Sequence, residues 1–143
     1  MTVDRELVTR KLLLIMADLE QLRAIHAAGE DAYLAGRIDQ LVCERLLERI
    51  VTRMIDVNYH RLTATGHPPP SDYYASFQQL GSIGILDSAF AARVARAAGL
   101  RNRLVHDYDD LDQHLLFGAL AGAIEDVPAY MAAVRAFLGR DGA

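Results

Sequence analysis

An all-α fold, an antiparallel bundle of four to five helices, is the architecture that this sequence predicts. Apolar residues recur with a period near 3.6 along most of the chain, which is the spacing of one face of a helix. The period-two alternation that is typical of half-buried strands is absent, and alanine and leucine are abundant. Glycine and proline clusters separate the periodic segments, so short turns should join helices that pack side by side.

The first two predicted helices are long and amphipathic. The first runs from about Val3 to Ala28 and stops at Gly29. The second runs from about Ala35 to Thr63, and its wide apolar stripe predicts a central position in the bundle. The two stripes consist of Leu12, Ile15, Leu19 and Leu22, and of Cys43, Leu47, Ile50, Met54 and Val57. The opposite face of the second helix carries Arg45, Arg49, Thr52, Asp56 and His60.

A proline-rich loop over Gly66–Pro70 separates these helices from a short third one. Ser71 or Asp72 can cap this helix, which should extend to about Leu80. Tyr73 and Tyr74 are expected to anchor it, with base stacking as an alternative role.

Two further helices complete the predicted bundle. After a break at Gly81–Gly84, Asp87 or Ser88 caps a fourth helix over about Ser88–Leu104. The last helix spans about Asp109–Leu138, with Asp109, Asp110 and Asp112 in its first turn. Pro128 either kinks this helix or begins a separate one. Gly118 and Gly122 would permit another helix to approach closely.

The bulk properties predict one soluble domain over residues 1–143. A net charge of −4 excludes a surface that is positive throughout, so any nucleic-acid site must be local. The single cysteine, Cys43, lies on an apolar stripe where packing is its expected role, and a reducing compartment is the default. The charged N-terminus and the short apolar run Leu12–Met16 predict neither a signal peptide nor a membrane span. We therefore expect a cytoplasmic protein.

The candidate site lies in the segment Arg101–Tyr108 at the end of the fourth helix. Arg101 falls on the apolar face of that helix, between Ala97 and Val105. A guanidinium there needs polar partners, because a dry core would leave its charge uncompensated. Arg101 therefore either extends outward to solvent or faces a partner subunit or a phosphate.

His106 follows Arg101 by five residues, which is a rotation of roughly 140° in an unbroken helix. The two side chains can converge if the helix ends near Val105. They can also be brought together across a dimer axis, which would place two copies of the site in one cleft.

An arginine and a histidine together suit RNA cleavage without a metal. His106 can move a proton near neutral pH, and Arg101 can stabilise charge on a phosphate while the 2′-hydroxyl attacks. No acidic cluster predicts a metal site, and no cofactor is predicted. A second face of the helix could hold flanking phosphates through Arg93, Arg96 and Arg103.

These residues resemble a known family, the HepT-like toxins of the HEPN superfamily. Arg101, His106 and Tyr108 match its Arg-x4-His-x-Tyr motif, with Asp107 in the variable position. The likeness covers most of the chain in the family's order. Its other parts are Ile55–Asp56 with His60, the proline-rich loop, Phe77–Leu80, Gly99–His106 and Glu125–Pro128.

The resemblance implies a HEPN-like homodimer with a cleft formed by both subunits. It implies a type VII toxin that cleaves RNA through Arg101 and His106, with Asn102 and Arg103 in support. It also implies an MntA-like nucleotidyltransferase antitoxin, which uses ATP to transfer AMP onto Tyr108. Added AMP would bring negative charge and bulk beside the arginine and histidine, and so block the RNA phosphate.

Less specific interpretations remain for each residue. Arg101 could be a surface arginine, His106 a helix-terminal residue favoured by the dipole, and Asn102 a cap of the helix end. Asp56 and His60 either line the cleft or form a solvated helix face. For the whole chain, the alternatives are a HEPN module that binds a nucleotidyltransferase without catalysis, and a helical dimer with no site.

Overall fold

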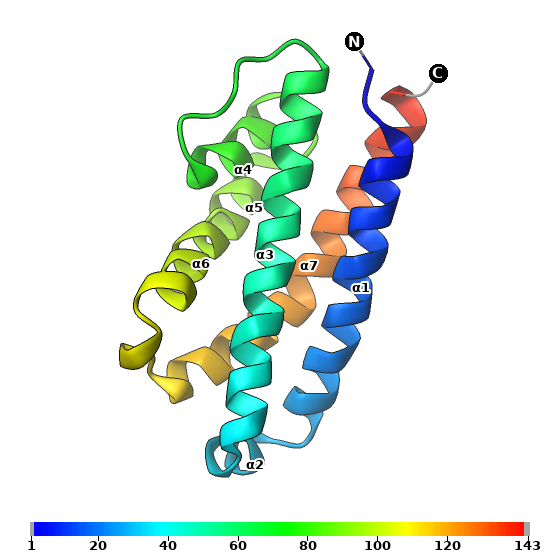
Figure 1. The fold of residues 1–143 in the computed structure, drawn as a ribbon. Helices are drawn as coiled ribbons and strands as arrows, with labels where there is room; N and C mark the ends of the chain where they lie inside the picture. The colour runs from blue at the N-terminus through cyan, green and yellow to red at the C-terminus, as the bar shows by residue number, and fades with distance from the viewer. Residues whose placement is uncertain (1, 142–143) are drawn as a thin grey trace.

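The structure is a computed structural model that describes residues 2–141, and all regular structure within that range is helical (Figure 1). The predicted fold class is therefore confirmed. The α-helices are α1 (Arg5–Ala27), α2 (Glu30–Ala35), α3 (Arg37–Ala64), α4 (Tyr73–Ser82), α5 (Ser88–Val94), α6 (Arg96–His106) and α7 (Gln113–Asp141). A 3₁₀ turn, η1 (Tyr108–Asp110), separates α6 from α7.

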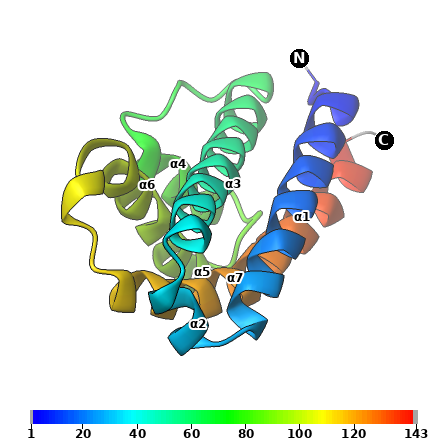
Figure 2. The same cartoon turned by 60° about the horizontal axis from the view of Figure 1, so that its bottom comes forward.

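The long helix α3 occupies the centre of the bundle, as its wide apolar stripe predicts. In Figures 1 and 2, α1 and the second half of α7 lie on one side of α3, and α4, α5 and α6 lie on the other. Helix α3 contacts α1, α4 and α6, and α1 also packs against α7. The first turn of α1 and the last turn of α7 lie at the same end of the molecule.

One hydrophobic core runs between these helices. Both predicted apolar stripes are buried, since each of their members is at most 1% exposed. Tyr33, Phe77 and Tyr130 add the largest fully buried side chains, and they come from α2, α4 and α7. Burial of this apolar surface is the main force that holds the helices together.

A group of buried polar side chains, called here the interior polar cluster, joins three helices. It consists of Asn58 on α3, Ser76 on α4 and Tyr130 on α7, all 0% exposed. The Asn58 amide donates to Ser76 Oγ at 3.0 Å, and the Tyr130 hydroxyl lies 2.5 Å from Asn58 Oδ1. Burial raises the pKa of Tyr130, so its hydroxyl stays protonated. The cluster satisfies its own polar groups, as a dry interior requires.

The segment between the first two predicted helices contains a helix that periodicity does not reveal. Gly29 ends α1 with a φ of 94°, and α2 follows directly. Tyr33 from α2 is buried, and the Gln40 side chain donates to the carbonyls of Tyr33 and Leu34. Six residues are too few to show a helical period, so contacts with α3 and α7 define this helix.

The predicted continuous helix over Ser88–Leu104 is wrong, because the chain forms α5 and α6 with a turn at Ala95. No glycine or proline marks this point. Helix α5 packs closely on α4, where a Cβ on Gly81 would lie 2.8 Å from the Ala91 Cβ, whereas α6 packs mainly on α3. The chain therefore turns at Ala95 because α5 and α6 pack against different helices. Gly81 itself lies inside α4, which ends at Ser82 instead of at Leu80.

The start of the last helix also differs from the prediction. Asp109 and Asp110 belong to η1, and Asp112 accepts hydrogen bonds from the backbone N–H groups of His114 and Leu115 at the start of α7. Pro128 lies inside α7 and does not begin a separate helix. A Cβ on Gly118 or Gly122 would meet nothing within 4 Å. No helix within residues 2–141 makes the close approach that these glycines permit.

Helix α7 is long and apolar enough between Gln113 and Leu138 to cross a membrane, by length and composition alone. This is weak evidence, because a helix of a soluble bundle can pass the same test. In this bundle α7 contributes Leu120 and Tyr130 to the core.

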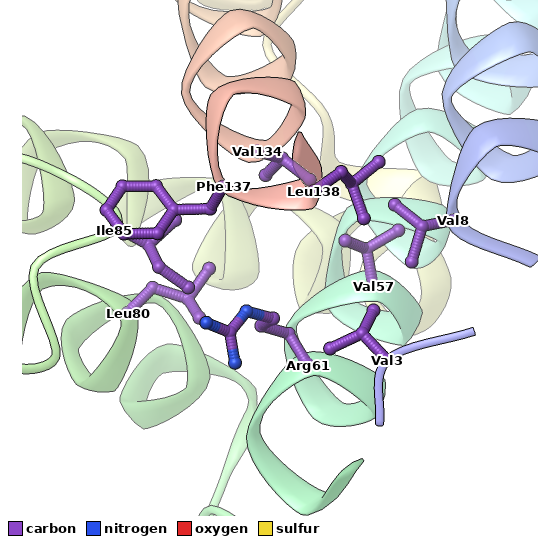
Figure 3. Close-up of a pocket in the computed structure, with 9 residues that line it drawn as sticks. All are labelled: Val3, Val8, Val57, Arg61, Leu80, Ile85, Val134, Phe137 and Leu138. Carbon is purple, nitrogen blue, oxygen red and sulfur yellow. The ribbon is translucent and has the colours of Figure 1, made fainter. Parts of the chain in front are cut away.

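A small apolar cavity lies where α3, α4 and α7 meet near the first turn of α1 (Figure 3). Its volume of about 10 Å³ is enough for about one water molecule. Arg61 extends along its edge toward Leu80, and its guanidinium also donates to Thr65 Oγ1. The cavity is too small for a substrate.

Candidate functional site

Arg101 is held by side chains from two other helices. Its Nε donates to Thr52 Oγ1 on α3 at 2.8 Å, and its Cζ lies 5.1 Å from the centroid of the Tyr73 ring on α4. The side chain is half-buried. Arg101 thus neither extends freely into solvent nor lies in a dry core. The cation is partnered by a hydroxyl and an aromatic ring, which both leave its charge uncompensated.

A surface hollow of about 330 Å³ opens beside this guanidinium, and we call it the Arg101 hollow. It is lined by Thr52, Ile55, Asp56, Tyr59, Tyr73 and Arg101. The Tyr59 and Tyr73 rings meet edge to face, with centroids 6.1 Å apart. Desolvation raises the pKa of Tyr59, so its ring stays uncharged at neutral pH.

The Arg101 hollow contains one carboxylate, and that carboxylate has another partner. Asp56 Oδ2 lies 3.0 Å from Lys11 Nζ on α1. Among the described residues, Arg101 forms no ion pair and makes its side-chain hydrogen bond through Nε. Its terminal nitrogens therefore remain available to an oxyanion from outside the chain, in the geometry that suits a phosphate.

His106 is the last residue of α6 and is exposed. The helix stays regular to that point, because Asp107 N–H donates to the Arg103 carbonyl at 2.8 Å. The helix thus ends one residue after Val105, close to the expected position, but this does not bring the two side chains together, and the rotation of roughly 140° between Arg101 and His106 holds. Within residues 2–141 the two side chains share no contact, so a single chain does not bring them together.

Tyr108 opens the η1 turn two residues beyond α6, and its side chain is 61% exposed. The acidic residues Asp107, Asp109 and Asp110 surround it in the sequence and are also exposed. Most of the Tyr108 surface is therefore open to solvent in the single chain.

The three arginines of the second predicted face do lie on one side of the molecule. Arg93, Arg96 and Arg103 line an apolar hollow of about 410 Å³ between α3, α5–α6 and α7. Arg93 is bound to Asp126 at 3.0 Å, whereas Arg96 and Arg103 form no ion pair within the described residues. Asn102, next to Arg103, is exposed.

The i, i+4 pair on α3 divides between two environments. Asp56 lines the Arg101 hollow, as one of its two interpretations expects. His60 lies outside that lining, and its Nε2 accepts a hydrogen bond of 2.8 Å from the Asp4 backbone N–H. That contact fixes the first turn of α1 to α3.

Sequence reasoning missed Thr52, Tyr73 and Lys11 as parts of the site. Thr52 belongs to the polar face of α3, one turn before Asp56, and this was the available signal. Tyr73, at the start of α4, contacts the Tyr59 ring and the Arg101 guanidinium. Lys11 lies 45 residues from Asp56, and no local pattern connects them. Within residues 2–141 no three His, Cys, Asp or Glu side chains gather as metal ligands do.

Solved structures share this helical arrangement. A tri-AMPylated HEPN toxin from Shewanella oneidensis in complex with an MNT antitoxin superposes with a TM-score of 0.85 at 19% identity, over 93% of this chain and 99% of that one. YutE from Bacillus subtilis, a cytosolic protein of unknown function, gives 0.81 at 18% identity, over 96% and 93%. At these identities the likeness establishes the fold alone, a helical arrangement that this chain shares with a HEPN toxin.

A sequence model of the family described as "Ribonuclease HepT-like" matches residues 15–134. The chain is also 33% identical to the tRNA nuclease HepT of Aphanizomenon flos-aquae (strain 2012/KM1/D3) over 136 residues, which is 95% of this chain and 92% of that protein. This chain therefore belongs to the HepT-like family.

Proposed function

We propose that this protein is the toxin of a toxin–antitoxin pair and acts as an endoribonuclease that needs no metal. The observation that carries the proposal is the state of Arg101, which Thr52 and Tyr73 hold at a surface hollow with its charge uncompensated within the described chain. The family membership and the tRNA nuclease relative support the same activity. Asn102 and Arg103, exposed beside Arg101, would support RNA binding.

The proposed reaction uses the ribose 2′-hydroxyl as nucleophile. Its oxygen forms a bond to the adjacent phosphorus, its proton passes to a histidine, and the bond from phosphorus to the 5′-oxygen breaks as that oxygen takes a proton. Arg101 stabilises the charge that builds on the phosphate. His106 is the proton-transfer residue, because an imidazole can both accept and donate a proton.

A homodimer would complete this site. In one chain, Arg101 and His106 leave α6 in directions roughly 140° apart. A two-fold axis would place Arg101 of one copy near His106 of the other, and it would supply one histidine to accept the proton and one to donate it. Both residues are accessible for this, since His106 is exposed and Arg101 is half-buried.

Tyr108 is the proposed site of silencing by a nucleotidyltransferase antitoxin of the MntA type. The tyrosine oxygen would form a bond to the α-phosphorus of ATP, with release of pyrophosphate. The exposure of Tyr108 and its position two residues beyond His106 support this role. One neighbour in fold is an AMPylated HEPN toxin bound to an MNT antitoxin, which is the same kind of complex. We infer that this protein and its antitoxin act in the cytoplasm.

The activity is tested with purified protein, RNA and excess chelator. Cleavage should persist with chelator and should be lost in His106→Ala. His114→Ala is the matched control, because His114 is also exposed on the bundle but pairs with Glu30. Full activity in His106→Ala would refute the mechanism, and inhibition by chelator would refute metal independence. Intact mass after coexpression with the antitoxin should rise by whole AMP increments, and Tyr108→Phe should abolish the rise.

The second candidate is a module that binds the nucleotidyltransferase without catalysis. The separation of Arg101 and His106 in one chain favours it. Expression without the partner distinguishes the two functions, because a nuclease toxin should arrest growth and Arg101→Ala should relieve that arrest. Equal growth of cells expressing wild type and Arg101→Ala would support the binding module.

A further inference from the structure

We propose that Thr52, Tyr73 and the Lys11–Asp56 ion pair are positioning residues, which hold Arg101 with its terminal nitrogens free for the RNA phosphate. This inference rests on the proposed ribonuclease function and adds to it the means by which the site is prepared. None of the four side chains belongs to the Arg-x4-His-x-Tyr motif, and they come from α1, α3 and α4.

Thr52 fixes the inner end of the guanidinium. Arginine has five N–H donors, and the bond of 2.8 Å to Thr52 Oγ1 uses the one on Nε. The four donors on the terminal nitrogens stay unused by side chains of the described residues. A long, flexible arginine loses rotamer freedom when it binds phosphate, so a side chain already held in place binds with a smaller loss.

Tyr73 limits the guanidinium from another side. The Arg101 Cζ lies 5.1 Å from the Tyr73 centroid, within the range of a cation–π contact. Tyr73 is itself held, since the Tyr59 ring meets it edge to face and Asp72 caps α4 directly before it. An aromatic partner orients the cation and leaves its charge in place, whereas a carboxylate would neutralise that charge.

The Lys11–Asp56 pair removes the competing anion from the hollow. Asp56 lines the same surface as Arg101, and arginine binds carboxylates through the same pair of donors that it offers to a phosphate. Lys11 Nζ lies 3.0 Å from Asp56 Oδ2, so the carboxylate is occupied. Both side chains are partly exposed, at 31% and 48%, so the pair adds little to stability and its effect lies in the charge of the hollow.

The first test compares isosteric and conservative variants of the two direct partners. Thr52→Val keeps the shape and loses the acceptor, so we expect kcat for RNA cleavage to fall about tenfold with KM less affected. Thr52→Ser keeps the hydroxyl and should stay within about twofold of wild type. In Tyr73→Leu, kcat should fall by about fivefold, whereas Tyr73→Phe keeps the aromatic ring and should leave kcat unchanged. Thr9→Val, at an exposed threonine on α1, is the matched control, and it should leave kcat and KM unchanged.

The second test is a rescue. Lys11→Met leaves Asp56 free to pair with Arg101, so we expect KM for RNA to rise about threefold to tenfold. Adding Asp56→Asn removes the competing charge, so Lys11→Met/Asp56→Asn should return to within about twofold of wild type. A merely structural ion pair would instead leave KM of the double variant as high as that of Lys11→Met, because the contact is absent from both. Thermal unfolding of every variant separates loss of fold from loss of positioning.

The outcomes separate the inference from the function on which it rests. If wild type does not cleave RNA while it is folded, the proposed function fails. If wild type cleaves RNA and Thr52→Val matches it, or Thr52→Ser falls as far as Thr52→Val, the role of Thr52 is refuted. Failure of Asp56→Asn to restore Lys11→Met refutes the role of the ion pair.

Discussion

Two sets of polar side chains, each joining α3 to α4 and to one further helix, illustrate different uses of polarity in a helical bundle. The interior polar cluster of Asn58, Ser76 and Tyr130 is fully buried, and its members bind one another. The Arg101 set, with Thr52 and Tyr73, opens onto a hollow and keeps donors unused. Satisfied polar groups in the interior fix how helices pack, whereas a cation with unused donors at the surface is prepared for a ligand.

Arg101→Ala should show the largest difference between its effect on RNA cleavage and its effect on stability. We expect RNA cleavage to fall by about a hundredfold to a thousandfold, because the charge on the phosphate loses its partner. The free energy of unfolding should change by no more than about 1 kcal/mol, since the side chain is only half-buried. Kinetics and urea unfolding measure the two effects. A stability loss as large as that of an interior variant would contradict the comparison.

Asn58→Ala should show the opposite pattern. It removes the amide that joins Ser76 to Tyr130 and leaves buried polar groups unpaired, so we expect stability to fall by about 2–4 kcal/mol. Cleavage per folded molecule should stay within about twofold. Asn102→Ala is the control on exposed surface and should leave stability unchanged. Normal stability of Asn58→Ala would mean that the interior polar cluster does not hold the bundle together.

Alkaline pH tests whether other buried groups, like Tyr130 in the interior polar cluster, stay protonated in the folded protein. Burial raises the pKa of Cys43 from 9.0 to about 12, and burial also raises that of Tyr33. The unfolded thiol ionises first, so stability is intact below pH 9 and decreases as the pH rises toward 12. Urea unfolding at pH 8 and pH 10.5 should differ by roughly 1–2 kcal/mol. Cys43→Ala should reduce that difference, and an unchanged difference would assign it to other groups.

The smallest expected effect is on KM for RNA, and it should differ between Arg96→Ala and Arg93→Ala. Arg96→Ala should raise KM for RNA by about twofold to fivefold and lower its salt dependence, as loss of one phosphate contact does. Arg93→Ala should have less effect, because Arg93 is already bound to Asp126. Filter binding at several salt concentrations measures both. Equal effects would show that the ion pair opens when RNA binds.

The sequence identifies the long helices and their buried faces because the period of apolar residues is a local property. Leu12 and Ile50 are buried where the stripes place them, and the motif from Arg101 to Tyr108 lies at the end of α6 and in the turn beyond it. Short elements escape this reasoning. Helix α2 has too few residues to show a period, and the turn at Ala95 carries no breaking residue.

What the sequence by itself determined is the class of the fold, the composition of the core and the identity of the motif residues, since each depends on spacing along one helix. Only the tertiary structure decided what surrounds Arg101. Thr52 lies 49 residues away and Lys11 reaches Asp56 across 45, so packing of α1, α3 and α6 had to bring them together. The physical reason is that a guanidinium's partners are set by distance in space, which periodicity within one helix does not encode.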